Sequence, residues 1–143
     1  MTVASILKQK PNRLISVGEK DSLADVAAIL TRENIGAVTV LDGQGEMVGI
    51  VSERDLVRQI AREGAGVLGN SVASVMTKSV VCCTPEDSIE GTMALMTERR
   101  FRHLPVRSQG RIIGMISIGD VVKRRVEDAE REAASLRDYI VRG

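Results

Sequence analysis

Two short motifs hold the residues with the clearest chemical potential, and each places a serine three positions before an aspartate. They span residues 49–55 (GIVSERD), with Ser52 and Asp55, and residues 114–120 (GMISIGD), with Ser117 and Asp120. At the start of a helix, Ser-x-x-Asp forms a capping box, because the serine accepts a bond from a free amide and the acid favours the positive helix end. The same junction offers amides to an anionic ligand, and its carboxylate suits the two hydroxyl groups of a ribose. The motifs alone are compatible with either role.

Few other residues offer catalytic or metal-binding chemistry. Phe101 and Tyr139 are the only aromatic rings and His103 is the only histidine. Base stacking of single-stranded nucleic acid, a zinc site and a Ser-His-acid triad are therefore all disfavoured. The adjacent Cys82 and Cys83 would close a strained disulfide ring, so we interpret them as small residues of a buried strand. We expect no metal site and no enzyme.

Composition and charge are those of a soluble globular domain. The 143 residues are 43% hydrophobic and 27% charged, with a net charge of +1. This balance gives no general attraction to nucleic acid or to an anionic membrane. The N-terminus lacks the apolar stretch of a signal peptide, and no run reaches the ~20 apolar residues of a membrane span. A cytoplasmic location is therefore expected.

The chain contains an internal repeat, which organises the fold. Residues 21–23 (DSL) match residues 87–89 (DSI), and the two Ser-x-x-Asp motifs match after one deletion in a turn. The leading residues 3–6 (VASI) likewise match residues 72–75 (VASV). We therefore predict two units, at residues 3–70 and 71–126, followed by an amphipathic helix at 127–143.

Each copy predicts the element order β-α-β-β-α, an α/β (α+β) fold. The expected elements are an extended stretch (14–17 or 80–83), a helix capped by Asp21 or Ser22 (or beginning at Ser88), two strands joined by a tight turn (37–41 and 48–51, or 103–106 and 112–116), and a helix after Ser52 or Ser117. One copy offers little core, so we expect the two to pack face to face. From Val122, apolar residues follow a heptad spacing. That helix either lies on its own domain or is shared across a dimer.

With these two repeats and their Ser-x-x-Asp motifs, the sequence resembles a pair of cystathionine-β-synthase (CBS) domains, also called a Bateman module. The resemblance covers residues 3–126 and is closest through residues 102–106 (RHLPV) and 114–120. It implies two sheets packed around a pseudo-two-fold axis, with two clefts that bind adenine nucleotides or related adenosyl compounds. It therefore implies regulatory binding rather than catalysis.

The resemblance also implies which residues form the ligand site, because positions of this sequence match the family's motif. The resemblance assigns ribose and phosphate contacts to Ser117, Ile118, Gly119, Asp120, Arg102, His103, Ser52 and Asp55. It assigns the adenine walls to Leu14, Ile15, Ser16, Ile35, Gly36, Ala37, Val38, Thr77, Lys78, Val80 and Val81. The first copy departs from the pattern: Gly36-Ala37 replaces the basic pair Arg102-His103, and Glu53 replaces Ile118. We therefore expect the clefts to differ and the one with Asp120 to be the better site. His103 is either a phosphate contact or a satisfied core residue.

The expected function is that of a non-catalytic sensor. AMP, ADP, ATP or NAD would act as a regulatory ligand, and no cofactor would be required. With so few aromatic rings, the base would be read by strand amides and aliphatic walls such as Ile15 and Val38. A homodimer and an unidentified regulated protein are the expected partners, and neither nucleic acid nor membrane is. The alternative is a ligand-free interaction module that acts through its surface helices.

Overall fold

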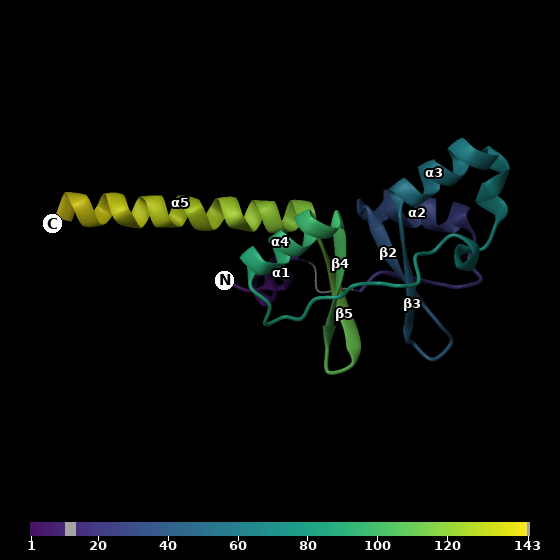
Figure 1. Cartoon of the computed structure of the whole chain (residues 1–143), viewed down its shortest axis with the longest axis horizontal. Helices are drawn as coiled ribbons and strands as arrows, with labels where there is room; N and C mark the ends of the chain where they lie inside the picture. The colour runs from purple at the N-terminus through teal and green to yellow at the C-terminus, as the bar shows by residue number, and fades with distance from the viewer. Residues whose placement is uncertain (11–13, 143) are drawn as a thin grey trace.

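The chain folds into two lobes side by side, from which one long helix projects (Figure 1). The structure is a computed structural model that describes residues 1–10 and 14–142. Its elements are α1 (Val3–Gln9), β1 (Ser16–Gly18), α2 (Leu23–Glu33), β2 (Ala37–Leu41), β3 (Met47–Ser52), α3 (Glu53–Glu63), the short 3-10 helices η1 (Ala65–Gly69) and η2 (Val72–Ser74), α4 (Ile89–Arg99), β4 (His103–Ser108), β5 (Arg111–Ser117) and α5 (Ile118–Arg142). The predicted mixed α/β architecture with a C-terminal helix is confirmed.

The first lobe is a three-stranded sheet covered by α2 and α3. Its strand order is β1-β2-β3, with β1 parallel and β3 antiparallel to β2. Ser22 begins α2 with a capping box, because its Oγ accepts a bond from the Asp25 amide (3.1 Å) and its own amide donates to Asp25 Oδ2 (3.1 Å). The apolar face of α2 and the inner faces of the strands form one core, which includes Leu23, Val26, Leu30, Val38, Val40 and Val51.

The second lobe departs from the expected strand pattern at residues 80–83. Its sheet consists of β4 and β5 alone, and Cys83 forms only an isolated parallel bridge with Val106. The Cys83 amide donates to Pro105 O (3.0 Å), and the Arg107 amide donates to Cys83 O (2.8 Å). After Cys83 the pairing is limited by Pro85, which has no amide hydrogen, and before it Thr77 pairs with Ile50 of β3 in the other lobe. Residues 78–82 therefore cross between the lobes.

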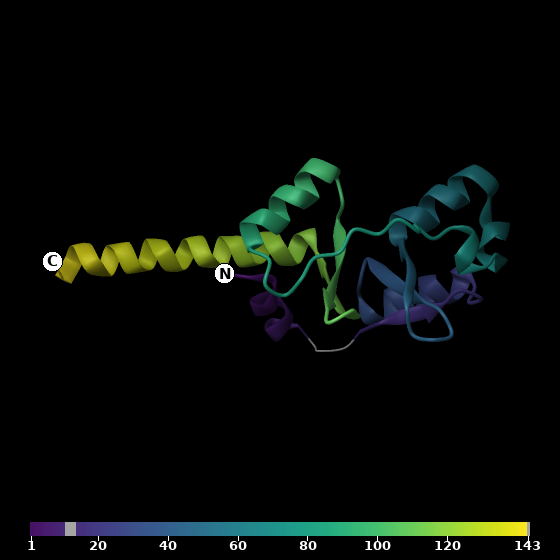
Figure 2. The same ribbon diagram turned by 60° about the horizontal axis from the view of Figure 1, so that its bottom comes forward.

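The segments that lead into each repeat are exchanged between the lobes. Helix α1 precedes the first repeat, yet Val3 and Ile6 belong to the core of the second lobe (Figure 2). The Val3 amide donates to Asp87 O (2.9 Å), and in the other lobe the Val72 amide donates to Asp21 O (2.8 Å). The ranges 3–70 and 71–126 are thus units of sequence repetition, whereas each folded lobe contains the leader of the other repeat.

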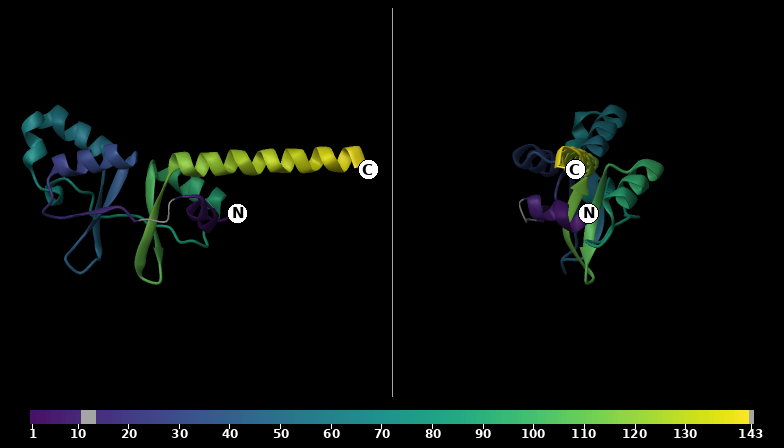
Figure 3. Two further views of the ribbon diagram at one scale, coloured as in Figure 1. Left: turned by 180° about the vertical axis from the view of Figure 1, so that it is seen from behind. Right: turned by 90° about the vertical axis from the view of Figure 1, so that its left-hand side faces the viewer.

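Helix α5 is continuous from Ile118, so the residues after 126 extend the last helix of the second repeat. Its first half is anchored, because Val121, Arg124 and Asp128 are buried. All described residues from 129 onward are exposed, and this half points away from both lobes (Figure 3). Among the described helices, none is both long and apolar enough to cross a membrane.

Candidate functional site

Both Ser-x-x-Asp motifs form capping boxes at strand-to-helix junctions. Between β5 and α5, the Ser117 amide donates to Asp120 Oδ2 (2.9 Å) and the Asp120 amide donates to Ser117 Oγ (3.1 Å). Between β3 and α3, the Ser52 amide donates to Asp55 Oδ2 (2.9 Å) and the Asp55 amide to Ser52 Oγ (3.3 Å). Capping is thus a real role of these residues, and it also fixes each carboxylate on the lining of a cleft.

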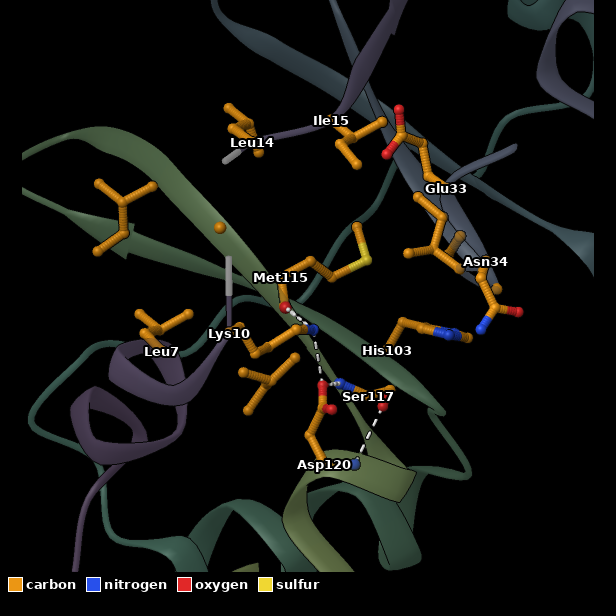
Figure 4. A pocket seen from close by; sticks show the side chains of 16 residues that line it. Leu7, Lys10, Leu14, Ile15, Glu33, Asn34, His103, Met115, Ser117 and Asp120 are labelled. Carbon is orange, nitrogen blue, oxygen red and sulfur yellow. Dashed lines mark hydrogen bonds and ion pairs between the residues drawn. The ribbon is translucent and has the colours of Figure 1, made fainter. Parts of the chain in front are cut away.

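The first cleft, defined as the cavity that contains Asp120, lies between the lobes and has a volume of about 560 Å³. That volume falls in the range of small-molecule sites, ~300–1,000 Å³. Asp120 and Ser117 lie at one end, and aliphatic side chains line the walls (Figure 4). The cleft brings together eight of the predicted residues: Leu14, Ile15, Ile35, Gly36, Ala37, His103, Ser117 and Asp120.

Lys10, at the end of the exchanged leader, contacts the predicted ribose-binding carboxylate. Its Nζ lies 2.8 Å from Asp120 Oδ2 and 3.0 Å from Met115 O (Figure 4). Burial by itself raises the pKa of Asp120, but the Lys10 ammonium and the Ser117 amide outweigh it, so the pKa lies below the ordinary value of 3.8. This contact could not be predicted from the sequence, because Lys10 lies in the first repeat's leader and Asp120 in the second repeat.

His103 lies at the boundary of both clefts and lines each of them. Its ring packs against Gly36, where an added Cβ would come within 2.9 Å of His103 Nε2. Burial lowers the pKa of His103 below 6.5, although Glu53 and Asp120 oppose the shift. A neutral imidazole at this position can serve as both donor and acceptor toward a ligand.

The second cleft, defined as the cavity that contains Asp55, is smaller, at about 270 Å³. It brings together seven of the predicted residues: Ser52, Asp55, Thr77, Val80, Val81, Arg102 and His103. Arg102 therefore lines the cleft of Asp55, whereas Gly36 and Ala37 line the cleft of Asp120. Each cleft combines the Ser-Asp motif of one repeat with the start of the second strand of the other.

Five predicted residues line neither cleft: Ser16, Val38, Lys78, Ile118 and Gly119. Val38 is fully buried in the first core, so it does not form the aliphatic wall expected of it. Ile118, which was expected to contact the ribose and phosphate, packs against the second core. Lys78 is exposed on the crossing segment. Within residues 1–10 and 14–142, no three His, Cys, Asp or Glu side chains gather as metal ligands would.

Comparison with known proteins agrees with this architecture. The CBS domain family model matches twice, at residues 3–62 and 72–127. The crystal structure of the CBS-domain containing protein ATU1752 from Agrobacterium tumefaciens has 44% sequence identity and a TM-score of 0.84, over 87% of this chain and 99% of that one. The mitochondrial CBS domain-containing protein CBSX3 of Arabidopsis thaliana is 36% identical over 127 residues, 86% of this chain. This chain spans 62% of that protein's length.

One solved structure of the same fold holds adenosine compounds. The CBS domain pair of protein MJ0100, in complex with 5'-methylthioadenosine and S-adenosyl-L-methionine, has a TM-score of 0.79 over 90% of this chain. Its sequence identity is 22%, so the likeness concerns the fold. The resemblance to a tandem domain pair, inferred above from residues 3–126, is confirmed by the two family matches.

Proposed function

This chain belongs to the CBS domain family as a tandem pair, and from that premise we propose that it is a regulatory module which binds an adenosine-containing ligand in the first cleft. One observation carries the proposal. Asp120 is held by its capping box at the end of a cavity of about 560 Å³ whose walls are mainly aliphatic. A fixed carboxylate beside apolar walls suits a nucleoside, because the ribose presents two hydroxyl donors and the base presents a flat apolar face. The domain pair of MJ0100 in complex with adenosine compounds supports the same ligand class.

In this proposal the ribose and Lys10 share one carboxylate. Asp120 Oδ2 already accepts bonds from the Ser117 amide and from Lys10 Nζ. A ribose that engages the carboxylate shifts the ammonium aside, where it can meet a phosphate or another acidic group at the 5' position. The base then lies along Ile15 and Ile35, since no Phe, Tyr or Trp is among the described residues that line the first cleft.

Signalling follows from where the first cleft lies. Its lining residues come from both lobes, and the exchanged leaders tie each lobe to the other. A ligand in the cleft therefore favours one arrangement of the lobes over others, and a regulated protein in the cytoplasm reads that arrangement. The proposal is binding without turnover.

Calorimetry tests the proposal directly. The intact chain is titrated with AMP, ADP, ATP, NAD, 5'-methylthioadenosine and S-adenosylmethionine. At least one ligand should bind, and Asp120→Asn should weaken its binding at least tenfold, about 1.4 kcal/mol. Asp55→Asn, the matched change in the second cleft, is the control for losing a capping carboxylate. If no adenosine compound binds, or if both variants weaken binding equally, the assignment to the first cleft is wrong.

Self-association through α5 is a second function, favoured by the exposed apolar stripe on this helix. The exposed fractions are 46% for Val122, 50% for Val126, 63% for Leu136 and 73% for Ile140. These residues, with Ala129 and Ala133, alternate four and three positions apart, which is the core spacing of a coiled coil. An isolated helical segment of this length is marginal in water. A partner helix would supply the missing apolar contact.

The flanking charges point to a second copy of this chain in parallel orientation. With Val126 as a core position, Arg125 and Glu132 take the positions that pair with Glu130 and Arg137 of a parallel partner helix. Both pairs join opposite charges, although Arg125 Nη1 also lies 3.7 Å from Glu90 Oε1 of its own chain. We therefore expect a homodimer.

A charge-exchange cycle tests this dimer by sedimentation. Glu132→Arg places an arginine opposite Arg137 of the partner helix and should weaken dimerisation at least tenfold, whereas Glu132→Arg combined with Arg137→Glu should restore it. The changes lie on an exposed surface, so the fold is unaffected. A monomeric native chain, or a double variant no better than the single one, rules out the parallel pairing.

A further inference from the structure

The boundary between the two clefts contains a titratable contact between the lobes that the proposed function does not use. His103 begins β4 of the second lobe, and its side chain lines both clefts (Figure 4). Its ring packs against Gly36 of the first lobe, where an added Cβ would lie 2.9 Å from His103 Nε2 and 3.5 Å from Glu53 Oε1. The imidazole of one lobe and a carboxylate of the other therefore face the same small space.

The backbones of His103 and Glu53 belong to the two strand-to-helix junctions that hold the Ser-Asp motifs. His103 is paired in register with Ser117, and Glu53 directly follows Ser52. The Glu53 amide donates to Gly36 O (2.9 Å), which fixes the glycine against which the ring packs. A change in this contact can therefore move the two junctions relative to each other.

The repeat shows that the contact has no counterpart on the other side of the molecule. At the matched positions, Ala37 stands in place of His103 and Ile118 in place of Glu53. These two side chains carry neither a charge nor a titratable proton. The matched position of Gly36 is Arg102, so the absence of a side chain at Gly36 is also specific to the side where the ring packs.

The charged groups around the imidazole come from both lobes. Burial is the largest influence and lowers the pKa of His103 below 6.5; Glu53 from α3 and Asp120 from α5 raise it, whereas Lys10 after α1 and Arg102 before β4 lower it. Within residues 1–10 and 14–142, neither ring nitrogen has a hydrogen-bond partner. The ring is therefore neutral at pH 7 and takes up a proton in weakly acidic solution. The other charged residues that line the clefts with it are Glu33, Arg54, Asp55, Arg58 and Arg100.

We propose that His103 and Glu53 form a proton-dependent contact between the lobes, which changes the arrangement of the lobes when the solution is acidified. A proton taken up from solvent makes both ring nitrogens donors and gives the ring a positive charge. The imidazolium then attracts the Glu53 carboxylate across the boundary, whereas the neutral ring only packs against Gly36. The proposal goes beyond the adenosine function and needs no ligand, because both partners belong to this chain.

NMR of the full chain without ligand tests the proposal. His103 is the only histidine, so its ring resonances are identified without ambiguity. They are followed from about pH 7.5 to about pH 5. Residual dipolar couplings of the backbone amides, measured at both ends of this range, give the orientation of one lobe relative to the other. In the native chain this orientation should change with pH, and in His103→Gln it should not.

A matched pair of variants on α3 tests the role of the carboxylate. Glu53→Gln keeps the size of the side chain and should lower the proton affinity of His103 about threefold or more, because the ring loses an attracting charge. The orientation of the lobes should then no longer depend on pH, although the ring still titrates. Glu63→Gln removes the same charge from the exposed far end of α3 and should leave both measurements as in the native chain.

Three results overturn the proposal. They are an unchanged proton affinity of His103 in Glu53→Gln, an equal effect of Glu63→Gln, and a native chain whose lobes keep one orientation over the whole pH range. If no adenosine compound binds to the native chain while its lobes still respond to pH through His103, only the adenosine proposal is lost.

Discussion

The glycines of the two repeated motifs give a prediction whose size follows from the structure. Gly49 of β3 is crossed by the segment that leads into the second repeat. A Cβ on Gly49 would lie 2.7 Å from Met76 Sδ and 2.9 Å from Thr77 O. That carbonyl is fixed, because it accepts a bond from the Ile50 amide (3.0 Å) while the Thr77 amide donates to Ile50 O (2.9 Å). Gly49→Ala must therefore move backbone.

The matched glycine of the second repeat meets only a flexible side chain. A Cβ on Gly114 would lie 3.2 Å from Leu7 Cδ2, and the end of a leucine can yield by a few tenths of an ångström. Overpacking against fixed atoms costs about 1–3 kcal/mol, and replacing glycine returns ~0.4–1 kcal/mol by restricting the unfolded chain. We expect Gly49→Ala to lower the free energy of unfolding by about 1–2 kcal/mol and Gly114→Ala to change it by less than ~0.5 kcal/mol.

Urea unfolding followed by far-ultraviolet circular dichroism measures both variants, since the chain has no tryptophan. The melting temperature of Gly49→Ala should fall by roughly 2–6 °C. The matched Gly114→Ala serves as the control for replacing a strand glycine by alanine. Equal losses in the two variants, or a larger loss at Gly114, would refute the idea that the crossing backbone is what requires glycine.

Three further predictions concern ionisable groups. Burial lowers the pKa of His103 below 6.5, so the unfolded chain takes up a proton first as the pH falls. The free energy of unfolding should therefore decrease below about pH 6.5. The midpoint of urea unfolding measured against pH should show this decrease in the native chain and lose it in His103→Gln. Lys10→Met should lower the free energy of unfolding by only ~0–1 kcal/mol at neutral pH, because the side chains of Lys10 and Asp120 are 35% and 26% exposed. The same substitution should raise the pKa of Asp120, which NMR can measure. Burial, with the nearby Asp87 and Cys82, raises the pKa of the Cys83 thiol to about 12. In the native protein Cys83 should therefore resist alkylation while Cys82 reacts. Equal alkylation rates of the two cysteines, measured by mass spectrometry, would contradict the burial of Cys83.

The repeat made much of the fold predictable from the sequence. Strand β2 was predicted at its observed bounds, and the cap at Ser22 and the two Ser-Asp capping boxes follow from local rules. The exchange of the leaders could not be predicted, because aligning two repeats shows which residues are equivalent and not which lobe each leader packs against. Residues 80–83 were predicted as a strand for a related reason. Their small apolar side chains suit a sheet, but the crossing between lobes leaves only Cys83 in register.

The features of the site that follow from the backbone arrangement of the two repeats could be predicted from the sequence. Contacts made by individual side chains could not. Asp120 and Asp55 each line a cleft, and the two clefts differ as Gly36 and Arg102 suggested. The contact of Lys10 with Asp120 depends on the leader exchange, so it was missed.

The central claim is that Asp120 holds the ribose of an adenosine ligand in the first cleft. The most direct measurement compares the calorimetric affinities of AMP and 2'-deoxy-AMP for the native chain and for Asp120→Asn. If the carboxylate accepts the 2'-hydroxyl, removing that hydroxyl should cost about tenfold in the native chain, ~1.4 kcal/mol, and almost nothing in the variant. An equal loss in both proteins, or no preference for the ribose form in the native chain, would contradict the claim.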